Sequence, residues 1–226
     1  MLRILFVEPG AAVAGPAIFI DRDGVINCRR PDDYVLDWSQ FIFLPGMRVA
    51  LKQLATLGLP MIVISNQAAV GKGLLDSSRL EEITTRMQQA LLSDGTPLAA
   101  AYYCIHRADE NCPCRKPKPG LLVKAAADFQ IDLRRSIFIG DSASDVEAAQ
   151  AAGCQPVLFG AALNLGTSPN LGTGPKAASS SLEWLQELSQ ARTANDLFEV
   201  ATASRDRNAQ IRNPTHVVSI RDKVIA

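Results

Sequence analysis

Two carboxylates at the end of an apolar run are the first residues in the chain that could do chemistry. Asp21 and Asp23 follow Ile18-Phe19-Ile20, which predicts a short buried strand, and Gly24 allows a sharp turn after them. Because side chains alternate along a strand, residues 21 and 23 should point to the same side where the strand ends. In such a pair, one carboxylate can attack or bind a metal while the other moves a proton. Taken alone, a surface Asp-x-Asp-Gly turn remains the alternative.

Three cysteines and one histidine form a second group that could do chemistry. Cys104, His106, Cys112 and Cys114 lie within eleven positions, enough to close a tetrahedral Zn²⁺ site. With all four positions filled by protein, the ion would be structural. The alternative is a set of buried thiols with an incidental histidine. The odd total of five cysteines and this clustering favour metal binding in a reducing cytoplasm over disulfides.

Strands and helices alternate along the chain, and their order positions these residues. We predict strands at 18–20, 61–64, 101–105, 137–141 and 156–159, with helices at 47–57, 78–91, 119–129 and before 153. This pattern is typical of an α/β fold with a Rossmann-like, doubly wound parallel sheet flanked by helices. Sites in such sheets lie beyond the carboxyl ends of the strands. Asp21, Ser65 and Asp141 all fall there, so we expect them to share one site.

The remaining segments suggest how the chain is divided. Residues 1–16 are predicted to form an N-terminal arm or an extra strand, and residues 17–190 the main domain. Within that domain, 161–180 reads as a loop or linker rich in Gly, Ser and Thr. Residues 191–226 are a C-terminal extension of unknown role. The insert between the first two strands is too short for a separate cap domain, so we expect an open site.

Composition excludes several classes of partner. The 23 basic and 23 acidic residues balance, and no run rich in Lys and Arg appears, which disfavours nucleic acid and anionic membranes as partners. No apolar run is long enough to span a membrane. The chain has only two histidines, His106 in the cysteine cluster and His216 in the tail, so carboxylates must do the proton work. We expect a cytoplasmic monomer that acts on a small molecule.

Four motifs in order resemble those of the haloacid dehalogenase superfamily of phosphohydrolases. They are Asp21-x-Asp23-Gly24, Ser65-Asn66-Gln67, Arg115-Lys116-Pro117 and Gly140-Asp141-x-x-x-Asp145. With the cysteine and histidine cluster, the chain is similar to the D-glycero-D-manno-heptose 1,7-bisphosphate 7-phosphatases and to their relatives, the histidinol-phosphate phosphatases. The resemblance starts at residue 17 and extends to about residue 160.

The resemblance implies a Mg²⁺-dependent phosphatase that works through an aspartyl-phosphate. Asp21 would be the nucleophile, and Asp23 would protonate the leaving oxygen and later deprotonate water. Ser65 and Lys116 would neutralise the phosphoryl oxygens. Mg²⁺ would be held by Asp21, the backbone carbonyl of Asp23 and Asp141.

The same resemblance assigns supporting residues. Asn66, Gln67 and Arg115 would contact the substrate, and Asp145 would orient Lys116 or a water on the metal. The cysteine and histidine cluster runs directly into Arg115 and Lys116, so a bound zinc would hold the segment that carries them.

Substrate identity depends on finer features. Val25-Ile26-Asn27, Tyr34-Val35 and the segment 41–46 look more like the heptose group, which predicts the 7-phosphate of a heptose bisphosphate as the target. Histidinol phosphate is the alternative substrate. Residues 68–73 depart from the pattern usual in these families, since Lys72 replaces an arginine, which keeps the charge but loses bidentate geometry. From another class, a non-catalytic, zinc-stabilised binding module is the competing hypothesis.

Overall fold

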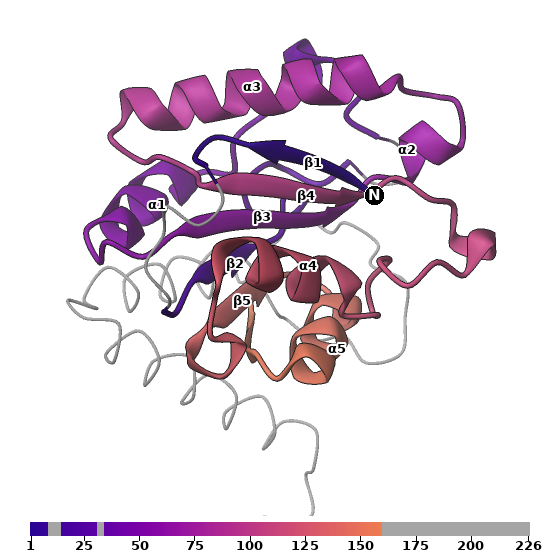
Figure 1. The fold of residues 1–226 in the computed structure, drawn as a ribbon. Coiled ribbons are helices and arrows are strands. Elements are labelled where there is room, and N and C mark those ends of the chain that lie inside the picture. The colour runs from indigo at the N-terminus through magenta and orange to yellow at the C-terminus, as the bar shows by residue number, and fades with distance from the viewer. Residues whose placement is uncertain (9–14, 31–33, 160–226) are drawn as a thin grey trace, which may run out of the picture.

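A six-stranded sheet lies between two layers of helices (Figure 1). The computed structural model describes residues 1–8, 15–30 and 34–159. The predicted linker at 161–180, the rest of the main domain up to 190 and the extension at 191–226 lie outside these residues.

The sheet is parallel except at one edge. Its strands are β1 (Leu2–Leu5), β2 (Ile18–Ile20), β3 (Met61–Asn66), β4 (Ala100–Cys104), β5 (Ile137–Gly140) and β6 (Gln155–Leu158). Their order is β1-β4-β3-β2-β5-β6, with β1 antiparallel to β4 and every other pair parallel. The predicted α/β fold with a doubly wound parallel sheet is therefore confirmed. Within residues 1–8, Leu2–Leu5 forms an added strand at the sheet edge.

The helices are α1 (Met47–Ala55), α2 (Ala68–Gly71), α3 (Ser77–Ser93), α4 (Gly120–Phe129) and α5 (Ala143–Ala152), with 3₁₀ turns at Trp38–Gln40, Ala108–Glu110 and Leu133–Arg135. The predicted start of the second long helix was wrong. Asp76, with an extended backbone, is the N-cap of α3, so the helix begins at Ser77 and not at the predicted residue 78. Among the described helices, none is both long and apolar enough to cross a membrane.

The central strand β2 is buried on both faces, which makes it a rigid platform. Ile18 and Ile20 pack into a core with α1 and α3, whereas Phe19 packs into a second core with α4 and α5. All three side chains have no exposed surface. This is expected for a parallel sheet covered by helices on both sides. The residues that follow Ile20 therefore start from a well-defined position.

The segment after β2 folds back as a flap, which we define as residues 28–30 and 34–44. Hydrogen bonds from Cys28 N to the Ile42 carbonyl (2.8 Å) and from Leu44 N to the Ile26 carbonyl (2.9 Å) close its base. Trp38 stacks on Phe41 with ring centroids 4.9 Å apart, and this aromatic group packs against the core that contains α1 and α3. The flap is thus part of the main core, and the described residues form no separate cap domain.

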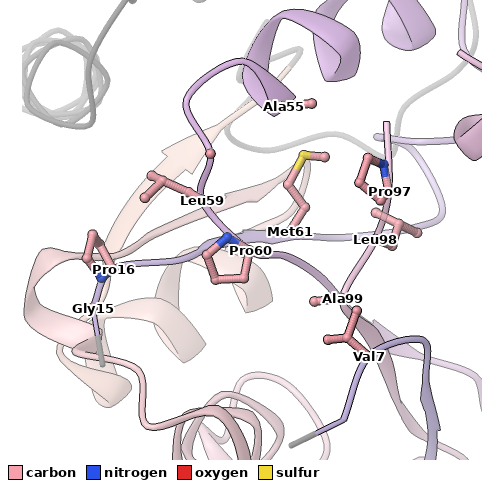
Figure 2. A pocket seen from close by; sticks show the side chains of 11 residues that line it. Val7, Gly15, Pro16, Ala55, Leu59, Pro60, Met61, Pro97, Leu98 and Ala99 are labelled. Atoms are coloured by element: carbon pink, nitrogen blue, oxygen red, sulfur yellow. The ribbon is translucent and has the colours of Figure 1, made fainter. Parts of the chain in front are cut away.

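An apolar hollow of about 560 Å³ opens at the amino-terminal edge of the sheet (Figure 2). Pro60 and Met61 at the start of β3, Leu98 and Ala99 before β4, and Pro16 before β2 lie around it. Asp21, Ser65 and Asp141 lie at the opposite, carboxyl-terminal edge. The hollow is therefore separate from the site described next.

Candidate active site

A buried lysine joins two acids beyond the carboxyl ends of the strands. Lys116 Nζ lies 2.9 Å from Asp21 Oδ1 and 2.5 Å from Asp145 Oδ1, and it also donates to the Ile64 carbonyl at 3.1 Å. The side chains of Lys116, Asp21 and Asp145 are 3%, 6% and 1% exposed. Asp21 is fixed as well by its backbone N–H, which donates to the Ile139 carbonyl on β5 (2.8 Å). A charged group this deep is retained only with partners, and each of these has them.

The site carries more acid than base. Oxygens of Asp21, Asp141 and Asp145 lie within 4.8 Å of one another. Burial raises the pKa of Asp21, although Lys116 opposes the shift, and burial together with Asp21 raises the pKa of Asp141 to about 7. Burial alone would lower the pKa of Lys116, but the carboxylates outweigh it and raise that pKa. This crowding of acids favours the binding of an added cation.

Asp145, at the start of α5, makes two different interactions with its two carboxylate oxygens. One carboxylate oxygen contacts Lys116, and the other accepts from the backbone N–H of Ser142, the N-cap residue, at 3.0 Å. The acid is thereby fixed as a capping group and as a partner of the lysine. Asp145 is therefore not merely an exposed acid at a helix N-terminus, because its carboxylate is buried and paired with Lys116.

Asp23 has a different set of partners from Asp21. Its carboxylate accepts from Arg22 Nη2 (3.0 and 2.9 Å), Asn27 Nδ2 (2.9 Å) and Gln67 Nε2 (2.6 Å). Burial would raise the pKa of Asp23, but the arginine and the amide donors outweigh it and lower that pKa. Its side chain is 27% exposed. Asp23 thus keeps one open side.

Sequence analysis assigned no role to Arg22, which is the unspecified residue x of the Asp21-x-Asp23 motif. It is 1% exposed, and its guanidinium lies over the ring of Tyr103, 6.0 Å from the centroid. The Tyr103 hydroxyl is within 2.9 Å of the Thr84 hydroxyl. The alternation of side chains gave a possible signal, because residue 22 must point away from the pocket that residues 21 and 23 approach.

The Ser65-Asn66-Gln67 motif connects the end of β3 to both catalytic candidates. Asn66 accepts from the Lys116 backbone N–H (3.1 Å) and donates to the Lys116 carbonyl (3.2 Å). Gln67 Nε2 bridges Asp23 and Ser65 Oγ, which is 3.1 Å away. Both amides, predicted to contact substrate, have protein partners that position their neighbours. Arg115 differs, since its Nη1 is buried and has no hydrogen-bond partner among the described residues.

Two glycines leave space that the acids occupy. A Cβ on Gly24, whose φ is +97°, would lie 1.8 Å from Asp141 Oδ2. A Cβ on Gly140 would lie 2.2 Å from the Cβ of Asp145. Only glycine permits this close approach. The backbone after Asp23 and the Asp141 carboxylate therefore face each other across a short gap.

A second arginine, also missed from sequence, lies in that gap. Arg29 Nη2 donates to Asp141 Oδ1 at 2.7 Å and to the backbone carbonyl of Asp23 at 3.4 Å. Its side chain is 54% exposed, whereas that of Asp141 is 16% exposed. Because residues 29 and 141 are far apart in the chain, no local pattern predicts this pair.

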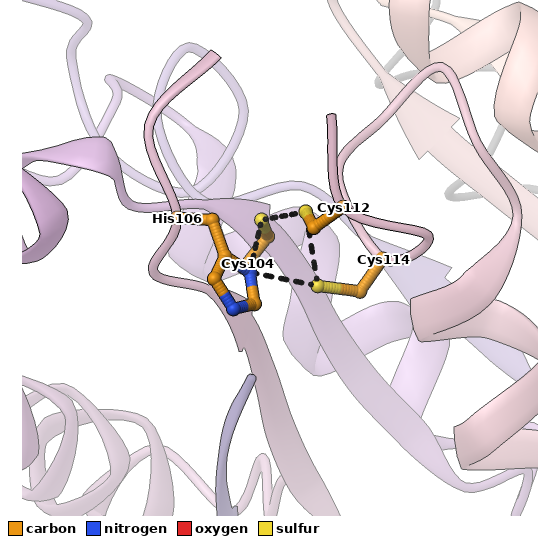
Figure 3. A group of neighbouring side chains, drawn as sticks. All are labelled: Cys104, His106, Cys112 and Cys114. Atoms are coloured by element: carbon orange, nitrogen blue, oxygen red, sulfur yellow. Dashed lines mark hydrogen bonds between the residues drawn. The ribbon is translucent and has the colours of Figure 1, made fainter. Parts of the chain in front are cut away.

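The cysteine and histidine cluster is assembled as the sequence predicted it could be (Figure 3). Around the ring, Cys104 Sγ lies 3.5 Å from Cys112 Sγ, Cys112 Sγ 3.5 Å from Cys114 Sγ, Cys114 Sγ 3.2 Å from His106 Nδ1, and His106 Nδ1 3.6 Å from Cys104 Sγ. Ligands about 2.0–2.3 Å from a tetrahedral zinc lie about 3.5–3.8 Å from one another. The spacing and the soft donors therefore fit zinc.

The oxygen cluster fits a hard cation instead. Asp21 and Asp141 supply carboxylates, and the Asp23 carbonyl faces Asp141 across the gap beside Gly24. Carboxylate and carbonyl oxygens are the ligands that Mg²⁺ accepts, with water and phosphate completing its shell. The excess of acid over base gives the attraction such an ion needs.

A doubly wound sheet with an Asp-x-Asp turn after its central strand, a buried lysine and acids after β5 defines a haloacid dehalogenase-like (HAD-like) hydrolase. The family model described as "HAD-hyrolase-like" matches residues 113–161. A solved structure of a D,D-heptose 1,7-bisphosphate phosphatase from B. bronchiseptica, complexed with magnesium and phosphate, is similar with a TM-score of 0.61 and 35% identity. The match covers 64% of this chain and 80% of that one.

Curated relatives narrow the class. The D-glycero-beta-D-manno-heptose-1,7-bisphosphate 7-phosphatase of Pseudomonas aeruginosa is 38% identical over 141 residues, which cover 62% of this chain and 79% of the relative. The D-glycero-alpha-D-manno-heptose-1,7-bisphosphate 7-phosphatase of Mycobacterium bovis is 39% identical over 159 residues, covering 67% and 83%. The chain belongs to this family of heptose-bisphosphate phosphatases within the HAD-like hydrolases, and it is a phosphoric monoester hydrolase.

Proposed function

We propose that the enzyme removes the 7-phosphate of D-glycero-D-manno-heptose 1,7-bisphosphate through an aspartyl-phosphate on Asp21. The relatives carry this activity in their names, for both the alpha and the beta anomer. The observation that carries the proposal is the buried contact between Asp21 and Lys116, 2.9 Å apart. It places a nucleophilic carboxylate beside a cation that can neutralise a phosphoryl group.

The first chemical step forms one bond and breaks another. An Asp21 oxygen attacks phosphorus in line, while the bond from phosphorus to the sugar oxygen breaks and Asp23, protonated at this stage, gives that oxygen its proton. In the second step, Asp23 takes a proton from a water that attacks the aspartyl-phosphate, which releases phosphate and restores Asp21. The open side of Asp23 is where the leaving oxygen and then the water would approach.

In this proposal, Lys116 and Ser65 stabilise the negative charge on the phosphoryl oxygens. Charge in a loose phosphoryl-transfer transition state lies mainly on those oxygens, so nearby cationic and hydroxyl donors stabilise it. Asp21, Asp141 and the Asp23 carbonyl would hold Mg²⁺, which would supply further positive charge to the same oxygens.

The remaining residues would position these groups or hold the rest of the substrate. Asp145 and Asn66 fix Lys116 through its ammonium and its backbone, and Gln67 fixes Asp23 and Ser65. The buried, unpartnered Nη1 of Arg115 makes it our candidate for the second phosphate of the bisphosphate.

A structural zinc completes the proposal. Its ligands would be Cys104, His106, Cys112 and Cys114. The last of these, Cys114, lies two residues before Lys116 in the chain. The ion would hold the loop that delivers Lys116 and would take no part in the reaction. Location in the cytoplasm and a monomeric state stay predictions from the sequence.

A side-by-side assay tests the function. Phosphate release is measured with Mg²⁺ on the heptose bisphosphate and on histidinol phosphate, and ³¹P NMR identifies which phosphate leaves. The heptose 7-phosphate should be hydrolysed with the higher kcat/KM. A preference for histidinol phosphate would reject the proposed substrate.

A variant tests the nucleophile. Asp21→Asn should lower kcat by at least about a thousandfold, because the amide cannot form the covalent intermediate. Circular dichroism and Tm control for folding. Asp128→Asn is the matched control, since this acid pairs with Arg3 and Lys124 rather than with residues of the candidate site. Turnover by Asp21→Asn at the wild-type rate would exclude Asp21 as the nucleophile.

A further inference from the structure

The guanidinium of Arg29 lies where the proposed magnesium ligands converge. It contacts Asp141 Oδ1 at 2.7 Å and the backbone carbonyl of Asp23 at 3.4 Å. The Asp141 carboxylate and the Asp23 carbonyl are two of the three protein groups assigned to the metal. Arg29 Nε would also lie 3.2 Å from a Cβ on Gly24, so the side chain borders the gap that this glycine keeps free.

Two cations that approach the same oxygen closely repel each other. A carboxylate oxygen held by a guanidinium must therefore lose that partner before an ion can bind to it at about 2.1 Å. We propose that Arg29 is a tethered counterion of the magnesium site, which neutralises Asp141 in the metal-free enzyme and must move away when Mg²⁺ binds. This inference rests on the metal site of the proposed function.

The surroundings of Arg29 allow that movement. Its side chain is 54% exposed and starts at the base of the flap, so rotation about its own side-chain bonds can carry the guanidinium into solvent. Arg22, which lies between the two acids, provides the contrast. It is 1% exposed and held by both oxygens of Asp23, so it cannot exchange partners in this way.

The ion pair also solves a problem of the metal-free protein. Asp141 lies among the carboxylates of Asp21 and Asp145, and the ammonium of Lys116 is already shared between those two. Without Arg29, Asp141 would have no ion pair within 4 Å in the described part of the chain, and only the field of Lys116 would offset its charge. The arginine therefore compensates the charge of Asp141 and, by the same contact, weakens the binding of Mg²⁺.

Direct metal binding tests the inference without turnover. Mn²⁺ is titrated into the purified, substrate-free enzyme at low salt, and free Mn²⁺ is measured by electron paramagnetic resonance. Arg29→Gln should bind Mn²⁺ about fivefold more tightly than wild type, equivalent to about 1 kcal/mol, the upper range for a partly exposed ion pair. Competition with Mg²⁺ should show the same ratio.

Two controls make the result specific. Arg86→Gln removes the same charge from the surface of α3, where Arg86 is 51% exposed and pairs with Glu82, and it should leave the Mn²⁺ Kd unchanged. Asp141→Asn removes a proposed ligand and should weaken Mn²⁺ binding at least tenfold if the ion binds at this site.

The outcomes separate the inference from the proposed function. An Arg29→Gln Kd equal to or weaker than wild type, while Asp141→Asn weakens binding, overturns the role of Arg29 and keeps the metal site. Equal tightening in Arg86→Gln also overturns it, because the effect would then be one of net charge. Failure of every variant and of wild type to bind Mn²⁺ rejects the metal site and the inference together.

Discussion

The buried pair of Arg22 and Asp23 should contribute strongly to stability, and Arg22→Met tests this. Methionine fills much of the space of the arginine stem but cannot pair with the carboxylate. The guanidinium is 1% exposed and donates to both oxygens of Asp23 at 2.9–3.0 Å. Its removal leaves a mostly buried acid without its cation.

The expected loss in free energy of unfolding depends on the hydrogen-bond donors that Asp23 keeps in the variant. Breaking a buried ion pair by removing one partner costs about 3–5 kcal/mol. Asp23 keeps the amide donors of Asn27 and Gln67 and has a side chain that is 27% exposed, so we expect the lower end, about 3 kcal/mol. For a chain of this size, that loss should lower Tm by about 6–12 °C.

Thermal unfolding in a double-mutant cycle measures the effect. Asp23→Asn and Arg22→Met/Asp23→Asn complete the cycle, and the double variant should lose about 2 kcal/mol less than the sum of the singles. A Tm of Arg22→Met within about 2 °C of wild type, or strictly additive losses, would refute the reasoning.

The pH dependence gives a second check on the same pair. Arg22 and the amide donors lower the pKa of Asp23 below its ordinary value of 3.8. A lowered carboxyl pKa contributes stability that is present above the unfolded value and is lost as pH falls through the folded one. The stability difference between wild type and Arg22→Met should therefore be largest near neutral pH and shrink below about pH 4.

Three further predictions concern the two proposed metal sites. Cys112→Ser should reduce bound zinc from one equivalent to less than about half by metal analysis, and kcat should fall with it; full zinc occupancy would reject the four-ligand site. Gly24→Ala should reduce kcat about a hundredfold, because the new Cβ would lie 1.8 Å from Asp141 Oδ2, and normal kcat would contradict this crowding. Since the pKa of Asp141 is raised to about 7, a proton competes with the metal below that pH. Mn²⁺ affinity should fall about tenfold per pH unit below 7 and level off above it, and a flat profile would contradict the raised pKa.

Local patterns in the sequence were sufficient for the frame of the molecule. The apolar run before Asp21 predicted β2, and the Ile137–Gly140 run predicted β5, because buried parallel strands are continuously apolar. Alternation of strands and helices predicted the parallel sheet. The short helix α2 and the start of α3 at Ser77 were missed, since helix termini depend on backbone conformation that side-chain patterns specify weakly.

The sequence by itself determined which residues end the strands and where the cysteine and histidine ligands cluster, and it predicts that carboxylates do the proton work. Only the tertiary structure decided the partners of each charge. In the structure, Asp23 pairs with Arg22, Asp141 pairs with Arg29, and the backbone of Lys116 pairs with Asn66. The last two pairs join residues that are 50 or more positions apart in the chain. The physical reason is that periodicity encodes burial along one element, whereas the pairing of charges depends on where separate elements and loops bring them together after the sheet has formed.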